Sequence, residues 1–221
     1  MAHIIIRNIG PIRNVSIDLN KVNVFIGPQS SGKSTVAKIV SFCSWIEKNV
    51  ILKTQPEIKF YDRLMEYHNL ESTYFNDQSY IEYTSEHCTI TWSGNDVDNA
   101  QISVKLNKEK GLFRNRKIIY IPAERNFVTI PGLGKYNERR DNILGFLYDW
   151  FEAKQSYIGD SLFKLPLSSI SDVTYHYNKE NDMDYIKLDN GIEIRLRHAS
   201  SGIMSVTPLL VVFEYMNKIL Y

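Results

Sequence analysis

The sequence predicts a mixed α/β fold, and three observations lead to this prediction. A short apolar run, Val22–Ile26, enters a loop bracketed by glycines, and a helical pattern follows from Thr35 to Leu52. Alternating apolar and polar residues indicate short strands before this loop and again between Tyr80 and Ile121. Near the end of the chain, a Ser-Ser-Gly sequence stands between a predicted strand and a predicted helix. Strands, loop and helices in this order are typical of an α/β domain.

The composition is that of a folded protein and argues against several functional classes. Hydrophobic residues make up 43% of the chain, and the net charge is +1, so no overall basic excess indicates nucleic acid or an anionic membrane. No apolar run reaches the roughly 18–20 residues that span a bilayer, and the N-terminus lacks the features of a signal peptide. Cys43 and Cys88 match neither a disulfide framework nor a zinc cluster, and the histidines are dispersed. We expect a soluble cytoplasmic protein.

The glycine-bracketed loop matches the phosphate-binding pattern G-x-x-x-x-G-K-[ST] without a mismatch. Its glycines let the backbone curl, so that successive N–H groups face phosphates at the N-terminus of the following helix. Lys33 should reach the β- and γ-phosphates, and the Ser34 hydroxyl should bind Mg²⁺. The alternative is a plain strand, turn and helix rich in small residues. Nine residues are therefore expected to bind the nucleotide: Gly27, Pro28, Gln29, Ser30, Ser31, Gly32, Lys33, Ser34 and Thr35.

The segment before the loop separates this chain from many other phosphate-loop proteins. Three β-like runs, Ile4–Arg7, Val15–Leu19 and Val22–Ile26, precede the loop, whereas a simple kinase usually begins directly with the last of them. This layout resembles the ABC-type ATPases of the RecF, structural-maintenance-of-chromosomes and OLD-like group. Gln29 stands where that group usually has Asn.

The Ser-Ser-Gly sequence near the C-terminus forms a second marker, Ala199–Gly202, which we call the signature segment. A serine just before a helix caps it and leaves N–H groups facing outward, and with the helix dipole this makes a second anion site. The segment resembles the signature motif of ABC-type ATPases. The resemblance implies that Ser200, Ser201 and Gly202 meet the γ-phosphate held by the opposite subunit, so that ATP joins a homodimer. The alternative is a plain serine cap.

A third marker lies between the other two, where residues 117–128 read KIIYIPAERNFV. A strand followed by Pro-Ala-Glu-Arg also recurs in the ATPases that this chain resembles. Arg125 is a candidate for a phosphate or subunit-interface contact, since a guanidinium suits bidentate contact with oxyanions. Equally, Glu124 and Arg125 could form an ordinary local ion pair.

The markers predict a single ABC-type ATPase domain in four parts. These are a β meander with the loop and first helix, a second helix with an antiparallel β lobe, a helical insert, and β hairpins with the signature helix. The predicted bounds are 1–55, 56–134, 135–168 and 169–221. Within them, helices are expected over Pro56–Leu70 and Asn137–Gly159, with a tight hairpin turn at Asp189–Gly191.

The resemblance also implies residues that this chain lacks. In the related ATPases an apolar strand ending in two acids, the Walker B motif, follows the signature helix. Here the chain stops at VVFEYMNKILY, and Glu214 falls in a helical pattern, so the catalytic acids stay unassigned. Gln55 and Gln78 are both candidates for the glutamine that senses Mg²⁺. We expect a fragment, or a chain whose fold another polypeptide completes.

These inferences predict ATP and Mg²⁺ as cofactors and an ATPase that is weak or inactive in this chain alone. Completed by the missing half or a partner, it would couple hydrolysis to dimerisation, in DNA maintenance or anti-phage defence. The alternative is a non-hydrolysing, nucleotide-dependent module that scaffolds an effector protein. A GTPase is disfavoured, because NKEND at 178–182 does not satisfy N-K-x-D. DNA follows only from relatives that handle DNA ends, without support from the charge, and no membrane partner is expected.

Overall fold

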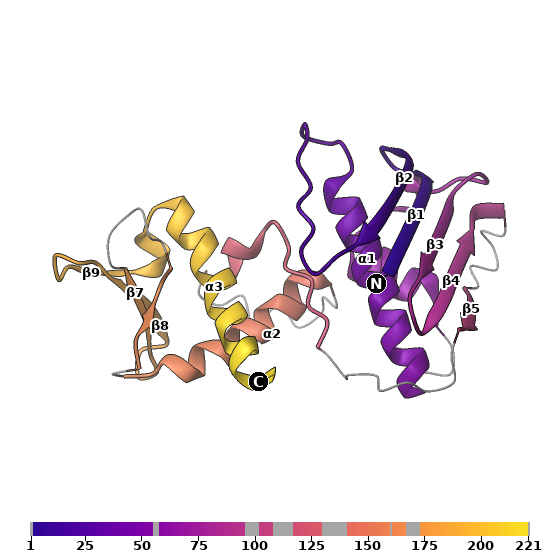
Figure 1. Cartoon of the computed structure of the whole chain (residues 1–221). Coiled ribbons are helices and arrows are strands. Elements are labelled where there is room, and N and C mark those ends of the chain that lie inside the picture. Colours follow the sequence, from indigo (N-terminus) through magenta and orange to yellow (C-terminus); the bar gives the residue numbers. More distant parts are fainter. Residues whose placement is uncertain are drawn as a thin grey trace. The chain divides into compact units, whose positions relative to one another are not determined.

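The chain folds into two compact units, Met1–Ile119 and Tyr120–Tyr221, each with its own antiparallel sheet (Figure 1). The structure, a computed structural model, describes residues 2–54, 58–95, 102–107, 117–129, 141–159, 161–166 and 173–220. The boundary between the units falls inside the predicted second part, 56–134.

Unit 1 contains a five-stranded sheet of order β2-β1-β3-β4-β5, in which every neighbouring pair is antiparallel. The meander and the later hairpins therefore form one sheet, which confirms the predicted antiparallel lobe. Its strands are β1 (Ala2–Ile9), β2 (Ile12–Leu19), β3 (Tyr80–Thr84), β4 (Cys88–Ser93) and β5 (Ser103–Leu106).

One face of this sheet is built from alternate residues of the central strands. Ile4 of β1 lies opposite Tyr83 of β3, and Tyr83 lies opposite Ile90 of β4. Because side chains alternate between the two faces of a strand, this register brings the buried apolar side chains of three strands together. The unit is thus held by pairing between segments about eighty residues apart in the chain.

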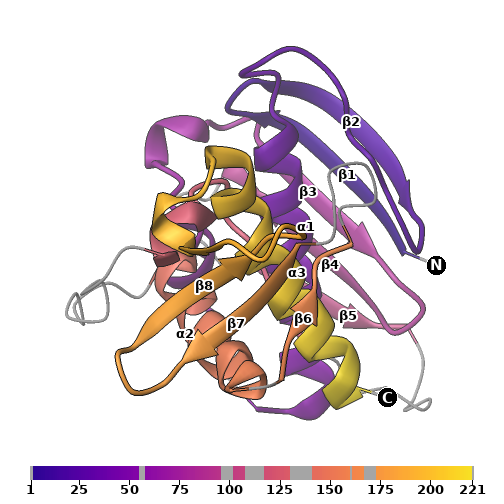
Figure 2. The same ribbon diagram turned by 90° about the vertical axis from the view of Figure 1, so that its left-hand side faces the viewer.

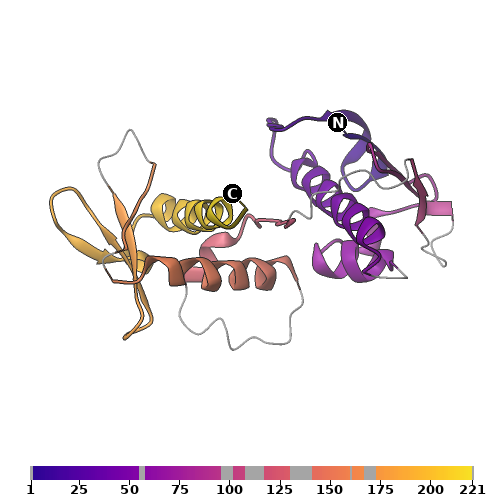
Figure 3. The same cartoon turned by 60° about the horizontal axis from the view of Figure 1, so that its bottom comes forward.

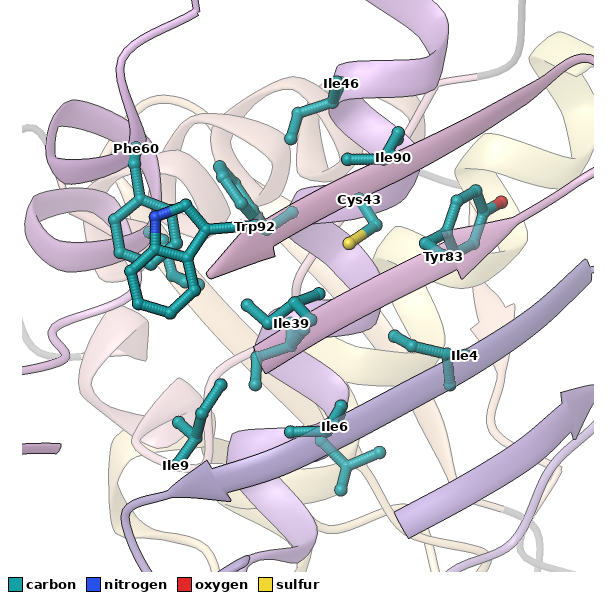
Figure 4. Close-up of a cluster of buried hydrophobic side chains, with 14 of the residues drawn as sticks. Ile4, Ile6, Ile9, Ile39, Cys43, Ile46, Phe60, Tyr83, Ile90 and Trp92 are labelled. Carbon is teal, nitrogen blue, oxygen red and sulfur yellow. The ribbon is translucent and has the colours of Figure 1, made fainter. Parts of the chain in front are cut away.

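Helix α1 (Lys33–Leu52) covers that face, as Figure 4 shows for Ile39, Cys43 and Ile46. These three residues are fully buried at a helical spacing of three and four. Burial raises the pKa of the Cys43 thiol strongly, and raises that of Cys88 to about 11. Both cysteines are therefore protonated packing groups near neutral pH, not reactive thiolates.

A buried carboxylate joins the same helix to the sheet through hydrogen bonds. Glu47 accepts one from the Tyr83 hydroxyl at 2.7 Å and one from the Ser85 hydroxyl at 2.6 Å. Burial, together with the bond to Glu47, raises the pKa of Tyr83. A buried carboxylate needs such donors, since a charge without partners would destabilise the core.

The helix predicted over Pro56–Leu70 is mostly replaced by a short π-helical segment, η1 (Tyr61–Tyr67), and Pro56 lies outside the described residues. The 3₁₀ turn η2 (Ser72–Tyr74) follows it. The Arg63 guanidinium carbon lies 4.5 Å from the centroid of the Trp45 ring and 3.8 Å from that of Tyr67. Cation–π contacts with both rings fix this segment against α1.

The predicted buried strand at Val22–Ile26 is wrong. These residues belong to no strand, and Val22, Val24 and Ile26 are 74%, 79% and 91% exposed. A strand forms only where a neighbour supplies backbone partners, and unit 1 places all five of its described strands in the antiparallel sheet. The predicted strand at the start of KIIYIPAERNFV is likewise not formed in the structure.

Unit 2 combines a four-stranded antiparallel sheet of order β6-β7-β8-β9 with two helices (Figure 2). Helices α2 and α3 pack against each other, and α3 also packs against the 3₁₀ segment η4 (Figure 3). The predicted β hairpins and the tight turn at Asp189–Gly191 are confirmed. The elements are η4 (Arg125–Thr129), α2 (Asn142–Lys154), η6 (Gln155–Tyr157), β6 (Phe163–Lys164), β7 (Thr174–Asn178), β8 (Met183–Lys187), β9 (Glu193–Arg195), η7 (Leu196–His198) and α3 (Ser201–Leu220).

A buried lysine links α2 to the β7–β8 hairpin of unit 2. The Lys154 ammonium donates to Asp182 at 3.1 Å, lies 3.9 Å from Asp184 and sits 4.1 Å from the centre of the Tyr177 ring. Burial alone would raise the pKa of Asp182, but hydrogen bonds from Tyr177 and Lys154 outweigh it and lower this pKa. Burial raises the pKa of Asp184, which accepts a hydrogen bond from the Tyr175 hydroxyl at 2.7 Å.

The substitution Lys154→Met should destabilise unit 2 in a pH-dependent way. At neutral pH it leaves the Asp184 carboxylate buried without its cation, so we expect the free energy of unfolding to fall by about 3 kcal/mol. Removing the lysine raises the pKa of Asp184 further, so the carboxyl becomes neutral as the pH falls and the loss should shrink in acid. Chemical denaturation followed by circular dichroism near neutral pH and near pH 4.5 measures both values.

The matched control is Lys179→Met, which removes an exposed lysine from the turn between β7 and β8. Its effect should stay within about 0.5 kcal/mol at either pH. An equal loss for Lys154→Met at both pH values would show that packing, and not charge, accounts for the effect.

Candidate functional site

The glycine-bracketed loop leads directly into the N-terminus of α1, as predicted. Gly32 is the residue before the helix, and the backbone carbonyl of Gly32 accepts the Val36 amide at 2.9 Å. The first N–H groups of a helix have no partner within it, and the first turn of α1 carries no acidic side chain. This end of α1 therefore presents amide donors and the positive end of a helix dipole.

Gly32 fixes where that helix begins relative to the sheet. Its φ of +91° is in the left-handed region that favours glycine. A Cβ added there would lie 2.7 Å from Cγ1 of Ile12, the first residue of β2. At Gly32 the backbone of the loop thus lies closer to the sheet than it could with any residue that carries a Cβ.

Lys33 folds back over the loop that precedes it. Its ammonium donates to the Gly27 carbonyl at 2.9 Å, to the Pro28 carbonyl and to the Ser31 hydroxyl at 3.3 Å. Three oxygens thus hold one positive charge inside the curve of the loop. An anion entering this curve would meet the ammonium together with the amides of the helix end.

The two residues after Lys33 differ in exposure, which separates what each can contribute. Ser34 is exposed, so its hydroxyl is accessible to a ligand or to a hydrated cation, while Thr35 is buried. Only the backbone of Thr35 can therefore contact a ligand at this site. Pro28, Gln29, Ser30 and Ser31 are exposed along the loop.

A pocket of about 360 Å³ adjoins the loop within unit 1. It lies between β2 and the segment that leads into the loop, and apolar side chains line it together with the polar side chains of Arg13, Asn14, Ser31 and Lys33. Neither Arg13 nor Asn14 stands out in the sequence. The only available signal was their position at exposed places on β2, which is weak because exposed polar residues are common on any sheet. The lining also includes Pro11, Ile12, Val15, Ile17, Phe25, Ile26, Ser31, Gly32, Lys33 and Val36.

The signature segment forms the N-terminus of α3 in unit 2. Ser200 caps the helix: its hydroxyl accepts the Ile203 amide at 3.4 Å, and its carbonyl accepts the Met204 amide at 2.9 Å. Ser201 and Gly202 are exposed, and a Cβ added at Gly202 would meet nothing within 4 Å. This second helix end therefore presents accessible amides, as the sequence predicted.

Comparison with known protein families gives the assignment. The model of a family described as AAA domain matches residues 3–192, which includes the loop, the sheet of unit 1 and much of unit 2. The chain belongs to this family. No curated protein matches the sequence significantly. AAA domains are nucleotide-binding P-loop ATPases that generally use ATP and Mg²⁺, which confirms the predicted nucleotide-binding class.

Polar side chains near the predicted motifs also have structural partners. Arg125 donates from Nε to the Ser205 carbonyl of α3 at 3.0 Å, and no Glu124–Arg125 ion pair occurs in the part of the chain that the structure describes. Asp141 caps α2 by accepting the amides of Ile143 and Leu144. His198 accepts from Arg197 at 3.2 Å if its Nε2 is unprotonated. Gln55 lies outside the described residues.

Two further features of the described residues concern metals and membranes. Among the described residues, no group of three His, Cys, Asp or Glu side chains could hold a metal ion. None of the helices described is both long and apolar enough to cross a bilayer.

The substitution Gly32→Ala should disrupt the loop by two effects that can be separated. The left-handed φ and the contact with Ile12 together should lower the free energy of unfolding by about 2–4 kcal/mol. The control is Gly191→Ala, where φ is +81° but nothing lies within 4 Å of the added Cβ, so about 1–2 kcal/mol is expected. Denaturation curves of both variants measure the difference. Equal losses would show that the Gly32–Ile12 contact does not matter.

Proposed function

We propose that this chain binds Mg-ATP on Gly27–Thr35, as a member of the ABC-type ATPases of the RecF, structural-maintenance-of-chromosomes and OLD-like group. The observation that carries the proposal is the Lys33 ammonium, held by loop oxygens directly beside the free N-terminus of α1. A phosphate group would replace these oxygens as the partner of the ammonium, and the helix amides would bind it from the other side.

The donors of the site fit a nucleoside triphosphate with its cation. The exposed Ser34 hydroxyl is a hard oxygen ligand, the type that Mg²⁺ prefers, and Mg²⁺ neutralises charge on the phosphates when bound. The pocket beside β2 has room for the nucleoside part, where Arg13 and Asn14 offer hydrogen-bond donors and Phe25 an aromatic surface. The loop and the pocket together form a continuous surface within unit 1.

The signature segment has a complementary role in this proposal. Ser200, Ser201 and Gly202 of a second copy would close over the γ-phosphate, so that ATP joins two chains. The support is the accessible N-terminus of α3, at which a serine cap and small residues leave the amides uncovered. One helix end alone is a weak anion site, whereas two ends on one triphosphate add their contributions.

Turnover is a separate question from binding. No acidic side chain lines the pocket in the described part of unit 1, so no described carboxylate is available to activate water there. We propose that hydrolysis requires acids supplied from outside these residues, and that the completed protein acts in DNA maintenance or anti-phage defence. The lack of an acidic side chain in the pocket lining also favours a second candidate, a non-hydrolysing module that captures an effector protein when ATP is bound.

The two cysteines, Cys43 and Cys88, are free and buried, which agrees with a cytoplasmic location.

The substitution Lys33→Ala should abolish most of the affinity for Mg-ATP. Losing a charged donor to the phosphates is expected to weaken binding about 100-fold, since such hydrogen bonds contribute roughly 1.5–3 kcal/mol. Calorimetric titration of Mg-ATP into both proteins measures this. The control Lys21→Ala removes an exposed lysine from the same unit and should bind like the original protein.

Two results would contradict nucleotide binding at this loop. One is the absence of any heat with the unaltered protein, and the other is equal affinity for the unaltered protein and Lys33→Ala.

The substitution Gly202→Glu should block ATP-dependent pairing and leave the fold intact. The position has open space, and an acidic side chain in a first turn stabilises a helix, but a carboxylate there repels a phosphate. Sedimentation with and without Mg-ATP should show a dimer for the original protein, and about 100-fold weaker association for the variant. Gly202→Gln, which has the same size without the charge, should retain more of the association. Equal dimerisation of the Glu variant would rule out this segment as the phosphate contact.

A further inference from the structure

The first two turns of α3 have a weakened backbone hydrogen-bond ladder. Pro208 lies inside this helix and has no N–H, so the Met204 carbonyl lacks its usual donor four residues later. The Thr207 hydroxyl is fully buried and has no hydrogen-bond partner among the described residues. The part of α3 that carries the signature segment is thus joined to the rest of the helix by fewer bonds than a regular helix provides.

A side chain from outside the helix contacts this weak region. The Nε–H group of Arg125 donates to the Ser205 carbonyl at 3.0 Å, across eighty residues of sequence. The contact is partly buried, and η4, which begins at Arg125, packs against α3 with Val128 and Thr129 buried. Ser205 is adjacent to Met204, whose carbonyl is deprived of a donor by Pro208. The arginine therefore supports α3 at the place where its own ladder is interrupted.

We propose that Arg125 is a positioning residue, which holds the first turns of α3 in the orientation that presents Ser200–Gly202 to phosphate. The inference rests on the proposed function of the signature segment. It assigns Arg125 to the helix carrying that segment and not to the phosphate itself.

The chemistry of the side chain suits this task. The guanidinium is planar and keeps its charge at any physiological pH, so its Nε–H points in a fixed direction once the side chain is packed. A charged donor to a carbonyl makes a stronger bond than a neutral one, and the partial burial of this bond limits competition from water. A lysine could donate to the same carbonyl but through a flexible stem, with less control of direction.

Hydrogen exchange in the absence of nucleotide tests the positioning role independently of ATP. In Arg125→Ala we expect the amides of Ile203–Val206 to exchange about tenfold faster, because losing the bond to the Ser205 carbonyl lets these turns open more readily. The amides of Val211–Met216, further along α3, should keep their rates. Arg125→Lys should show an intermediate effect. Arg197→Ala, an exposed arginine beside the signature segment, is the matched control and should resemble the original protein.

A second substitution tests whether Pro208 causes the weakened hydrogen-bond ladder in the first turns of α3. Pro208→Ala restores a donor for the Met204 carbonyl, so the effect of Arg125→Ala on exchange should become smaller in that background. Unchanged exchange in Arg125→Ala overturns the proposal. Acceleration along the whole of α3 also overturns it, because that would mean a general loss of structure.

Sedimentation with Mg-ATP then connects the contact to function. If the original protein dimerises, Arg125→Ala should associate about tenfold more weakly while its affinity for ATP at the loop is unchanged. Equal association of both proteins would overturn the positioning role. If the original protein does not dimerise, the proposed function fails, while hydrogen exchange still decides whether Arg125 positions α3.

Discussion

The close approach of Gly32 to Ile12 is the constraint on which the proposed phosphate-binding end of unit 1 depends. The residue before α1 lies against the first residue of β2, at a distance that leaves no room for a Cβ. From this point the helix crosses the sheet with Ile39, Cys43 and Ile46 buried beneath it. The hydrophobic core therefore sets the direction of the helix, and the glycine sets where the helix starts. A loop whose amides must face a ligand requires both.

The pattern of each segment predicted its local structure well where the partners are supplied nearby. The alternation of apolar and polar residues predicted β1, β3 and β4, and the apolar spacing after the loop predicted α1. Both patterns are informative because each places apolar side chains on the side of its element that is buried in the same core. The cap at Ser200 followed from residue type alone, since a hydroxyl before a helix has an available amide to accept.

The sequence patterns did not predict the structure where it depends on partners that are distant in the chain. Val22–Ile26 is as apolar as a buried strand, but a strand needs backbone neighbours, and those in unit 1 pair with one another. The contact of Arg125 with Ser205 spans eighty residues, so no local reading of the Pro-Ala-Glu-Arg segment could reveal it. The pocket with Arg13 depends on how the loop folds over β2, which the alternation of β2 does not encode. Pairings of this kind are settled by tertiary packing, not by local preference.

The two helix ends differ in how their charge is arranged, and this difference bears on how they would act together. At α1 the ammonium of Lys33 already lies among the loop oxygens, and a phosphate could replace them as its partner. At α3 no lysine or arginine stands in the first turn, Arg125 is directed to the helix backbone, and Arg197 donates from Nε to His198. The first end can therefore bind an anion by itself, while the second offers mainly dipole and amides. Such a helix end binds a free phosphate only weakly. It contributes appreciably when the phosphate is already held by a second site and is placed against it. In the proposed complex, ATP held by unit 1 of one chain would supply that phosphate to the α3 end of another. In this proposal, nucleotide binding would come first and pairing second.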